Sequence, residues 1–228
     1  MSEKITFVCA TPKNKIDFES TFLYKLKTHD LFKKYNYDVY YENDKGLSTI
    51  YNKAIQKNIN TTDIFVFIHD DVFINDLFFE EKIANGFHKY GFNILGVAGS
   101  KKINLDKKPI SWFNSSFPND MYGNVFHGKE LLNNFCVSNY NASFCYERVI
   151  TLDGLFLAVN AKVFNSTNLR FDENFKFNFY DIDFCFQAHK NNLTLGIVPL
   201  NIIHSSVGEG ILKEDYTIEQ TKFLKKTH

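Results

Sequence analysis

The N-terminal part of the chain alternates short apolar runs with segments whose apolar side chains recur at helical spacing. Short runs of branched and aromatic residues are typical of strands, whereas a stripe at i, i+3, i+4 and i+7 is typical of a helix. This pattern predicts strands over 5–10, 39–41, 64–68 and 93–98 and helices over 18–32, 47–59 and 77–90. Because strands and helices alternate, we expect an α/β fold with a mainly parallel twisted sheet and helices on both faces.

The alternation stops between Gly99 and Ile150, a segment rich in Asn, Ser, Gly and aromatic residues. So long a connection is usually functional or mobile in a compact domain, so we expect a long inserted loop region here. Regular patterns return as a strand over 151–159, a helix over 181–190 and a strand over 193–198. We find no internal repeat and no linker, and we expect a single domain over 1–228.

Composition narrows the class of protein. Hydrophobic residues make up 44% of the 228 residues and aromatic residues 17%, which is typical of a chain with one globular core. Lys+Arg and Asp+Glu both number 26, so no net charge favours a nucleic acid as partner. The four cysteines have no C-x-x-C spacing, and neither a signal peptide nor a membrane-spanning run is apparent. We therefore expect a cytoplasmic protein.

Candidate chemistry begins where the apolar run Ile64–Ile68 ends in His69, Asp70 and Asp71. In sheets of this kind ligands bind beyond the carboxyl ends of the strands. The two aspartates either cap the turn that follows or hold Mg²⁺ or Mn²⁺ together with a phosphate. His204, after a second apolar run, would add an imidazole and favour Mn²⁺, although a single late histidine is more often a structural hydrogen-bonding residue.

A second acidic pair, Asp181 and Asp183, lies at the start of the helix predicted over 181–190. Two residues apart on a helix, their side chains point to nearly opposite sides. We expect only one of them to face a reaction site, while the other caps or anchors the helix. An aspartate at a helix N-terminus is stabilised in its ionised form, which suits a general base.

Four motifs occur in order along the chain. They are H-x-D-V at 69–72, D-G-x-x-x-A-V at 153–159, F-D-E with F-x-F-Y-D-x-D within 171–183, and I-x-H-x-S-x-G at 202–208. With this ordered set the chain resembles bacterial glycosyltransferases of the GT-A (Rossmann-like) fold, in the family-2-like group. The resemblance implies a nucleotide-binding half at 1–99 and an acceptor-binding half at 100–228, with the long insertion as acceptor wall or lid.

The resemblance also implies a role for each matching residue. Asp71 would be a metal ligand, His204 would complete the metal site, and Asp181 would be the catalytic base. Residues implied to contact the nucleotide are Ala10, Thr11, Glu42, Asn43, Asn52 and Asp70, and those implied to contact donor or acceptor sugar are Trp112, Asp153, Gly154 and Asp183. Asn52 could equally be an exposed helix residue, Glu42 a turn residue, and Trp112 a packing residue.

Two positions depart from the family pattern: His69 replaces the first acid of the D-x-D motif, and Asn178 replaces a frequent histidine. Tyr180 stands where many relatives have glutamate, although Y-D is usual in this subgroup. The resulting hypothesis is a metal-dependent enzyme of polysaccharide biosynthesis. With Mn²⁺ or Mg²⁺ it would transfer a sugar, with inversion, from a nucleotide diphospho-sugar such as a UDP-sugar to a hydroxyl of a glycan or lipid-linked glycan.

Two other functions remain open. One is a non-catalytic nucleotide-sugar or glycan binding protein with the same fold. The other is a nucleotidyltransferase, which we rank last because the loop at 11–15 has no glycine to hold a triphosphate. The C-terminal segment 215–228 either packs on the sheet or makes a peripheral contact with the inner face of the cell membrane, where lipid-linked glycans are built.

Overall fold

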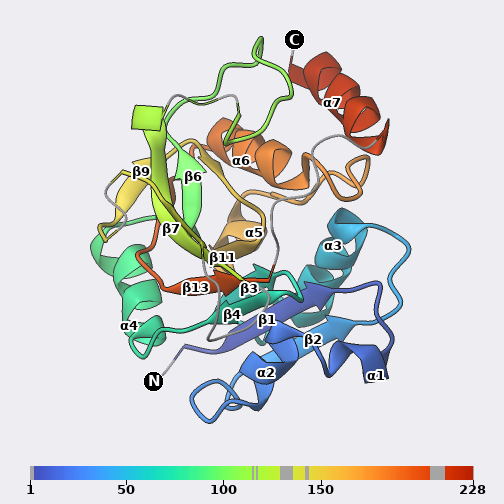
Figure 1. The fold of residues 1–228 in the computed structure, drawn as a ribbon, viewed down its shortest axis with the longest axis vertical. Helices are drawn as coiled ribbons and strands as arrows, with labels where there is room; N and C mark the ends of the chain where they lie inside the picture. Colours follow the sequence, from blue (N-terminus) through green and yellow to red (C-terminus); the bar gives the residue numbers. More distant parts are fainter. Residues whose placement is uncertain are drawn as a thin grey trace.

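The computed structural model describes residues 3–114, 116, 118–128, 136–141, 144–205 and 214–227. Its larger sheet has seven strands in the order β2, β1, β3, β11, β5, β12 and β9. In that order their bounds are Asn36–Tyr40, Ile5–Ala10, Ile64–Ile68, Phe156–Asn160, Ile94–Gly96, Leu195–Ile197 and Glu147–Val149. Figure 1 shows β1, β2 and β3 in the half of the molecule that also holds the N-terminus.

The fold is α/β, as predicted, and the larger sheet is mixed. Strand β1 pairs in parallel with β2 and β3, and β5 pairs in parallel with β12. Strand β11 runs antiparallel to both β3 and β5, between which it lies, and β9 runs antiparallel to β12. The sheet is therefore less parallel than the alternating pattern suggested.

A second sheet stands against the first and contains β10, β6, β7, β13 and β4 in that order, with β8 paired to β7. Their bounds are Thr151–Leu152, Ala98–Ser100, Met121–His127, Ile202–His204, Val72–Ile74 and Cys136–Asn139. Two expectations are corrected here. The strand predicted over 151–159 is divided between the two sheets, and the segment 99–150, expected to be one long loop, contains β7, β8 and β9.

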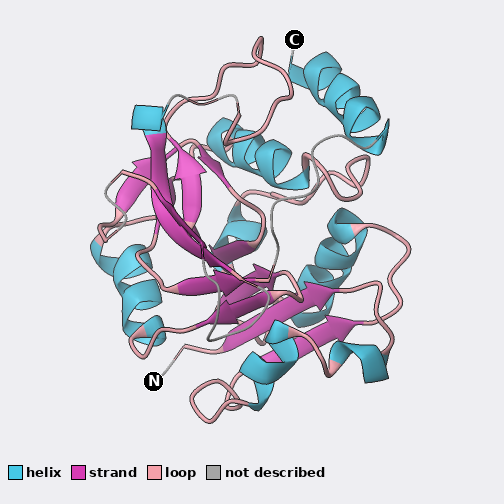
Figure 2. Cartoon of the chain, in the orientation of Figure 1, coloured by secondary structure: helices cyan, strands magenta, loops and turns pink. Residues whose placement is uncertain are grey.

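Helices cover both faces of the larger sheet (Figure 2). Their bounds are α1 Lys15–Phe18, α2 Phe22–Thr28, α3 Leu47–Asn58, α4 Phe79–Ala84, α5 Lys162–Ser166, α6 Tyr180–Lys190 and α7 Glu214–Thr227. A π-helical turn, η1 (Asn85–Lys89), continues α4, and a short 3-10 turn, η2 (Pro118–Asp120), precedes β7. In the part of the chain that is described, no helix is both long and apolar enough to cross a bilayer.

Strand β3 forms the centre of the core, because all five of its residues are buried. Phe65 and Phe67 face one way and pack with residues of α3 and α5, such as Tyr51 and Phe164. The alternate positions of β3 face α2 and α4 on the opposite side. Each fully buried Phe contributes about 1.5–3 kcal/mol. An apolar strand covered on both faces has only its ends exposed, and its carboxyl end is where the polar residues gather.

The C-terminal helix α7 packs against α6 and the segment before it, whereas we expected it on the sheet or at a membrane surface. Tyr216 and Phe223 are buried against Phe179, the residue before α6. Glu219 accepts hydrogen bonds from the backbone N–H groups of Lys176 and Asn178, both at 2.8 Å. Helix α7 thereby holds the segment that leads into α6.

Candidate functional site

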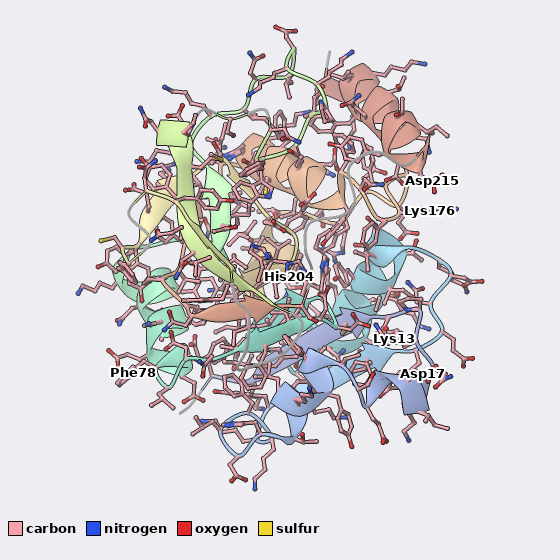
Figure 3. All side chains as sticks on the ribbon, in the orientation of Figure 1. Lys13, Asp17, Phe78, Lys176, His204 and Asp215 are labelled. Carbon is pink, nitrogen blue, oxygen red and sulfur yellow. The ribbon has the colours of Figure 1, made fainter. Side chains whose placement is uncertain are left out.

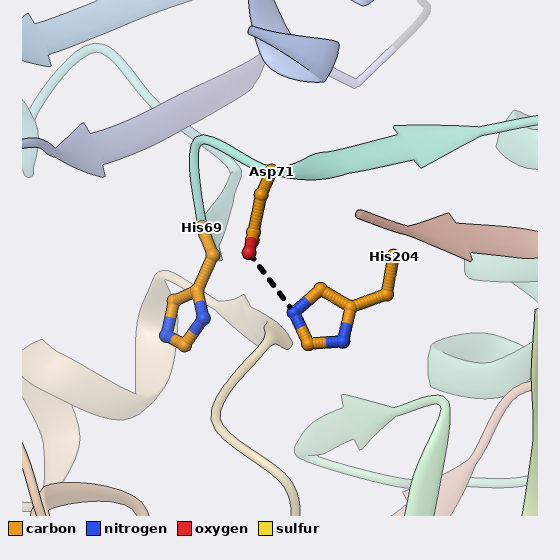
Figure 4. A group of neighbouring side chains, drawn as sticks. All are labelled: His69, Asp71 and His204. Atoms are coloured by element: carbon orange, nitrogen blue, oxygen red, sulfur yellow. Dashed lines mark ion pairs between the residues drawn. The ribbon is translucent and has the colours of Figure 1, made fainter. Parts of the chain in front are cut away.

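Three potential metal ligands meet at the carboxyl end of β3. One ligand atom each from His69, Asp71 and His204 lies within 4.8 Å of the others. The His204 Nε2 atom lies 3.2 Å from Asp71 Oδ2, and Figure 4 shows both imidazoles on the same side of the Asp71 carboxylate. Figure 3 places His204 toward the middle of the molecule, well inside outer residues such as Phe78. Predicted ligands Asp71 and His204 are thus neighbours, and His69 joins them.

Strand pairing explains why residues so far apart in sequence meet. His204 is the last residue of β13, and in the antiparallel pairing with β4 it lies opposite Val72. The Ser205 N–H donates to the Asp71 carbonyl at 2.8 Å, which extends this register by one step. Asp70 and Asp71 form a turn between β3 and β4, in which the Val72 N–H donates to the His69 carbonyl at 3.4 Å, and this turn brings the side chains of His69 and Asp71 together. Residues 206–208 of the late motif lie outside the described part of the chain.

The hydroxyl of Tyr180 joins this group to helix α6. Tyr180 Oη lies 2.8 Å from His69 Nε2. Tyr180 is the first residue of α6 and is buried, with 3% of its surface exposed. The base candidate Asp181 is the next residue, so one hydrogen bond connects the metal-ligand candidates to the helix turn that carries the carboxylate.

The turn between β10 and β11 brings a second set of predicted residues to the same place. Asp153 Oδ2 accepts a hydrogen bond from the Trp112 indole N–H at 2.8 Å, and Oδ1 accepts one from the Leu155 N–H at 3.0 Å. The Gly154 N–H donates to Asp181 Oδ2 at 3.0 Å. A Cβ atom at Gly154 would lie 2.1 Å from Tyr180 Oη, so this position has no room for a side chain. The D-G pair thus turns the chain and holds Asp181.

Asp181 has an unusual electrostatic environment. Burial and, second to it, the nearby charge of Asp153 raise its pKa to about 7, against the opposing effect of hydrogen bonds from the Ile182 and Gly154 N–H groups. The N-terminus of α6 therefore does not keep this carboxylate as strongly ionised as we expected. A carboxyl group with a pKa near neutrality can both accept and release a proton, which is the property of a general base.

The metal-ligand candidates influence one another. Burial lowers the pKa of His69. Burial would also lower the pKa of His204, but the hydrogen bond to Asp71 and the negative charge of Asp71 raise it overall. For Asp71, burial would raise the pKa, and the hydrogen bond and charge of His204 hold it below the usual value. Without an ion, Asp71 and His204 form an ion pair.

Two observations favour a cation among these three residues. Asp71 Oδ1 is buried and has no hydrogen-bond partner among the residues that the structure describes. Buried polar atoms without a partner are rare in proteins and often mark a missing ion or water. Two imidazoles and one carboxylate form a ligand set that divalent transition-metal ions accept. The residues present therefore fit a divalent metal ion.

The predicted nucleotide contacts fall into two groups. Ala10 and Thr11 lie at the end of β1, and backbone hydrogen bonds join Thr11 to Asn43 at 2.9 Å and Lys13 to Glu42 at 3.0 Å. Asp70 faces this group, because it accepts hydrogen bonds from Thr11 Oγ1 at 2.5 Å and Lys13 Nζ at 2.7 Å. These residues share the edge of the sheet at which the metal-ligand candidates lie.

Asn52 and Asp183 do not join the others. Both ends of the Asn52 side chain bond to the backbone of Phe171, and its amide nitrogen also reaches Glu173. Asp183 is buried in an ion pair with Lys226 of α7 at 2.7 Å. Their side chains support neighbouring segments, so we no longer assign Asn52 to the nucleotide or Asp183 to a sugar. This division of Asp181 from Asp183 is the one expected for helical spacing.

Sequence reasoning missed three features of the site. It treated His69 only as a departure from the acidic motif, because the turn at Asp70 and Asp71 that brings its side chain beside Asp71 was not predicted. It did not include Lys13, whose ammonium group pairs with Asp70. It noted Tyr180 as a replacement for glutamate but had no signal for its contact with His69, because that contact depends on the arrangement of distant segments.

Comparison with known proteins identifies the family. Residues 8–227 match the family model described as "Glycosyltransferase like family". The chain therefore belongs to this glycosyltransferase-like family. The comparison with curated proteins found no match.

Solved structures share the fold at low sequence identity. A197 from STIV has a TM-score of 0.52 at 11% identity, over 89% of this chain and 86% of that chain. S. aureus TarS 1-349 has a TM-score of 0.51 at 16% identity, over 89% of this chain and 60% of that chain. The same protein in complex with UDP has a TM-score of 0.54 at 16% identity, over 97% and 64% respectively. The chain thus spans less than two thirds of the TarS chains that it matches.

Proposed function

We propose that this protein is an inverting glycosyltransferase that moves a sugar from a nucleotide diphospho-sugar, most simply a UDP-sugar, to a hydroxyl of a glycan acceptor. The observation that carries the proposal is the convergence of His69, Asp71 and His204 with Asp153 and Asp181 at one edge of the sheet, in a chain of a glycosyltransferase-like family. The similarity of its fold to that of TarS, which binds UDP, supports the choice of donor.

In this reaction Asp181 is the general base. The acceptor oxygen forms a bond to the anomeric carbon while the bond from that carbon to the diphosphate breaks, and the nucleoside diphosphate leaves with the bonding electrons. Asp181 takes the acceptor proton, for which a pKa of about 7 is well matched. Asp153, whose other neighbours are Trp112 and the backbone of Leu155, lies beside Asp181 and is placed to orient sugar hydroxyls.

His69, Asp71 and His204 would hold a divalent ion, with Mn²⁺ as the first choice. Such an ion supplies positive charge where the diphosphate becomes more negative as it leaves, an effect worth several kcal/mol. On the neighbouring strand ends, Thr11, Lys13 and Asn43 are placed to contact the nucleotide. Lys13 now pairs with Asp70, and its ammonium group is available to a phosphate if that ion pair opens.

Thermal unfolding with nucleotide sugars tests the proposal. A donor that binds only the folded protein at about 100 times its Kd adds about 2.7 kcal/mol of stability, or about 5–10 °C in Tm for a chain of this size. We expect a UDP-sugar to raise Tm in the presence of Mn²⁺ and to do so much less with EDTA. A His204→Ala variant should lose the Mn²⁺-dependent part of the shift.

His88→Ala is the matched control, because His88 is an exposed histidine whose Nε2 atom pairs with Glu3 at 3.0 Å. This variant should respond as the wild-type protein does. Absence of a shift with every nucleoside diphosphate sugar would contradict the proposal. A shift without release of UDP, even after addition of glycan acceptors, would instead favour a non-catalytic nucleotide-sugar binding protein.

A further inference from the structure

The two ring nitrogens of His69 face different partners. Its Nε2 atom lies 2.8 Å from the hydroxyl oxygen of Tyr180. Figure 4 shows the other nitrogen, Nδ1, turned toward Asp71 and His204, the residues with which His69 forms the three-ligand group. One side of the imidazole therefore faces the metal-ligand candidates, and the opposite side faces helix α6.

This geometry constrains the tautomer of His69. A metal ion binds a ring nitrogen that carries no proton, and the second nitrogen then keeps its hydrogen. If Nδ1 is the ligand atom, Nε2–H must donate to an acceptor, and Tyr180 Oη is the atom in position. A hydrogen bond of this kind from a ligating histidine orients the ring and increases its basicity.

Tyr180 is well suited to hold an imidazole in place. Its ring is 3% exposed and packs in edge-to-face contact with Tyr51, with ring centroids 6.0 Å apart. Its hydroxyl also lies against Gly154, where a side chain would not fit. The hydroxyl can therefore move little, and it presents an oxygen to His69 at a fixed position.

We infer that Tyr180 is a positioning residue that keeps His69 in the Nε2–H tautomer and so presents its Nδ1 atom, without a proton, to a metal ion beside Asp71 and His204. The inference rests on the proposed function only in its use of the same metal site. Mg²⁺ prefers oxygen ligands and keeps several waters, whereas imidazole nitrogen suits transition-metal ions.

Metal binding by the purified full-length chain tests this directly, without nucleotide sugar or acceptor. MnCl₂ and MgCl₂ are titrated by calorimetry, and Mn²⁺ binding is followed in parallel by electron paramagnetic resonance and by quenching of the single tryptophan, Trp112. We expect wild-type protein to bind Mn²⁺ at least about tenfold more tightly than Mg²⁺. Tyr180→Phe should weaken Mn²⁺ binding by about 10- to 100-fold and change Mg²⁺ binding much less.

Tyr51→Phe is the matched control. The Tyr51 hydroxyl is also buried in this cluster, but it has no hydrogen-bond partner in the described part of the chain. Its removal should leave both metal affinities unchanged. His69→Asp is the opposite test, since it restores an oxygen ligand and should reduce the preference for Mn²⁺ over Mg²⁺.

The tautomer can also be observed in the unmodified protein, which keeps the inference testable if Tyr180→Phe folds poorly. Long-range ¹H–¹⁵N NMR spectra of the metal-free chain should show His69 protonated at Nε2 and not at Nδ1. An Nδ1–H tautomer, or equal Mn²⁺ affinity in Tyr180→Phe and wild-type protein, would overturn the inference. Either result could occur in an active glycosyltransferase, so failure here is distinct from failure of the proposed function.

Discussion

The first turn of α6 carries two aspartates whose side chains lie in two different regions of the molecule, with different neighbours. Asp181 points toward Gly154 and the cluster at the end of β3, where its oxygens accept hydrogen bonds from the backbone N–H groups of Gly154 and Ile182. Asp183 points toward α7, where it pairs with Lys226 at 2.7 Å and accepts a hydrogen bond from Gln187. We call these the β3-end region and the α7 region.

Burial is the main cause of the raised pKa of both carboxyl groups. The two differ in whether a cation lies beside the carboxylate. In each case burial raises the pKa, and for Asp183 the ammonium group of Lys226 opposes this shift. For Asp181 the nearest charged influence is Asp153, which has the same sign and adds to the shift. A buried carboxylate without a cation is destabilising, and such groups concentrate at functional sites. We conclude that the β3-end region is organised for chemistry and the α7 region for anchorage.

The largest expected effect comes from Asp181→Asn, which removes the base and nearly preserves the shape. Transfer to acceptor should fall by about 10²- to 10⁴-fold, the usual contribution of a general base. Donor binding should persist, because Asp181 is not among the metal-ligand or nucleotide-contact candidates. Single-turnover transfer and donor-induced Tm shifts measure the two properties separately, and unchanged transfer would remove Asp181 from the role.

The same substitution in the α7 region, Asp183→Asn, should lower stability and leave transfer nearly unchanged. It removes the charge that partners Lys226, whose ammonium group keeps only Asp172 at 2.6 Å. Hydrogen bonds to charged groups contribute about 1.5–3 kcal/mol, so we expect a loss of about 2 kcal/mol and about 4–8 °C in Tm. Transfer per folded molecule should remain near the wild-type rate. A large loss of transfer at unchanged Tm would mean that Asp183 acts in the site after all.

How much of the fold could be predicted from the sequence depended on whether each element is determined by neighbouring residues or by contacts between distant segments. Strand β3 is as predicted because five consecutive branched and aromatic apolar residues, followed at once by polar residues, suit a short buried strand. The helix over 47–59 likewise appears as α3. The strand expected over 151–159 is divided because Asp153 bonds to the Leu155 N–H and turns the chain at Gly154. The D-G pair was a turn signal, and the apolar residues around it outweighed that signal in the prediction.

Prediction of the site residues was limited in the same way. Helical spacing was enough to separate Asp181 from Asp183, but the partner of Asp183 is a lysine on the C-terminal helix, which no local pattern indicates. The acids at the strand end were recognisable because the carboxyl ends of neighbouring strands meet at one edge. The contact between His69 and Tyr180 could not be predicted, because it depends on the packing of α6 beside β3.

The smallest expected effect concerns pH and tests whether Asp153 tunes Asp181. The base works when deprotonated, so transfer should rise with pH along a limb whose midpoint lies near the Asp181 pKa of about 7. Asp153→Asn removes a negative charge that raises this pKa, so the midpoint should move to lower pH. Asp183→Asn should leave the midpoint in place, because the causes of the Asp181 shift do not include Asp183.

Linkage predicts a matching change in stability. A carboxyl group whose pKa is higher in the folded than in the unfolded state binds more protons when folded, so the free energy of unfolding falls as pH rises from about 4 to about 7. Asp153→Asn should reduce that fall, and pH profiles of transfer and Tm that do not move together would show that Asp153 acts on the reaction by another route.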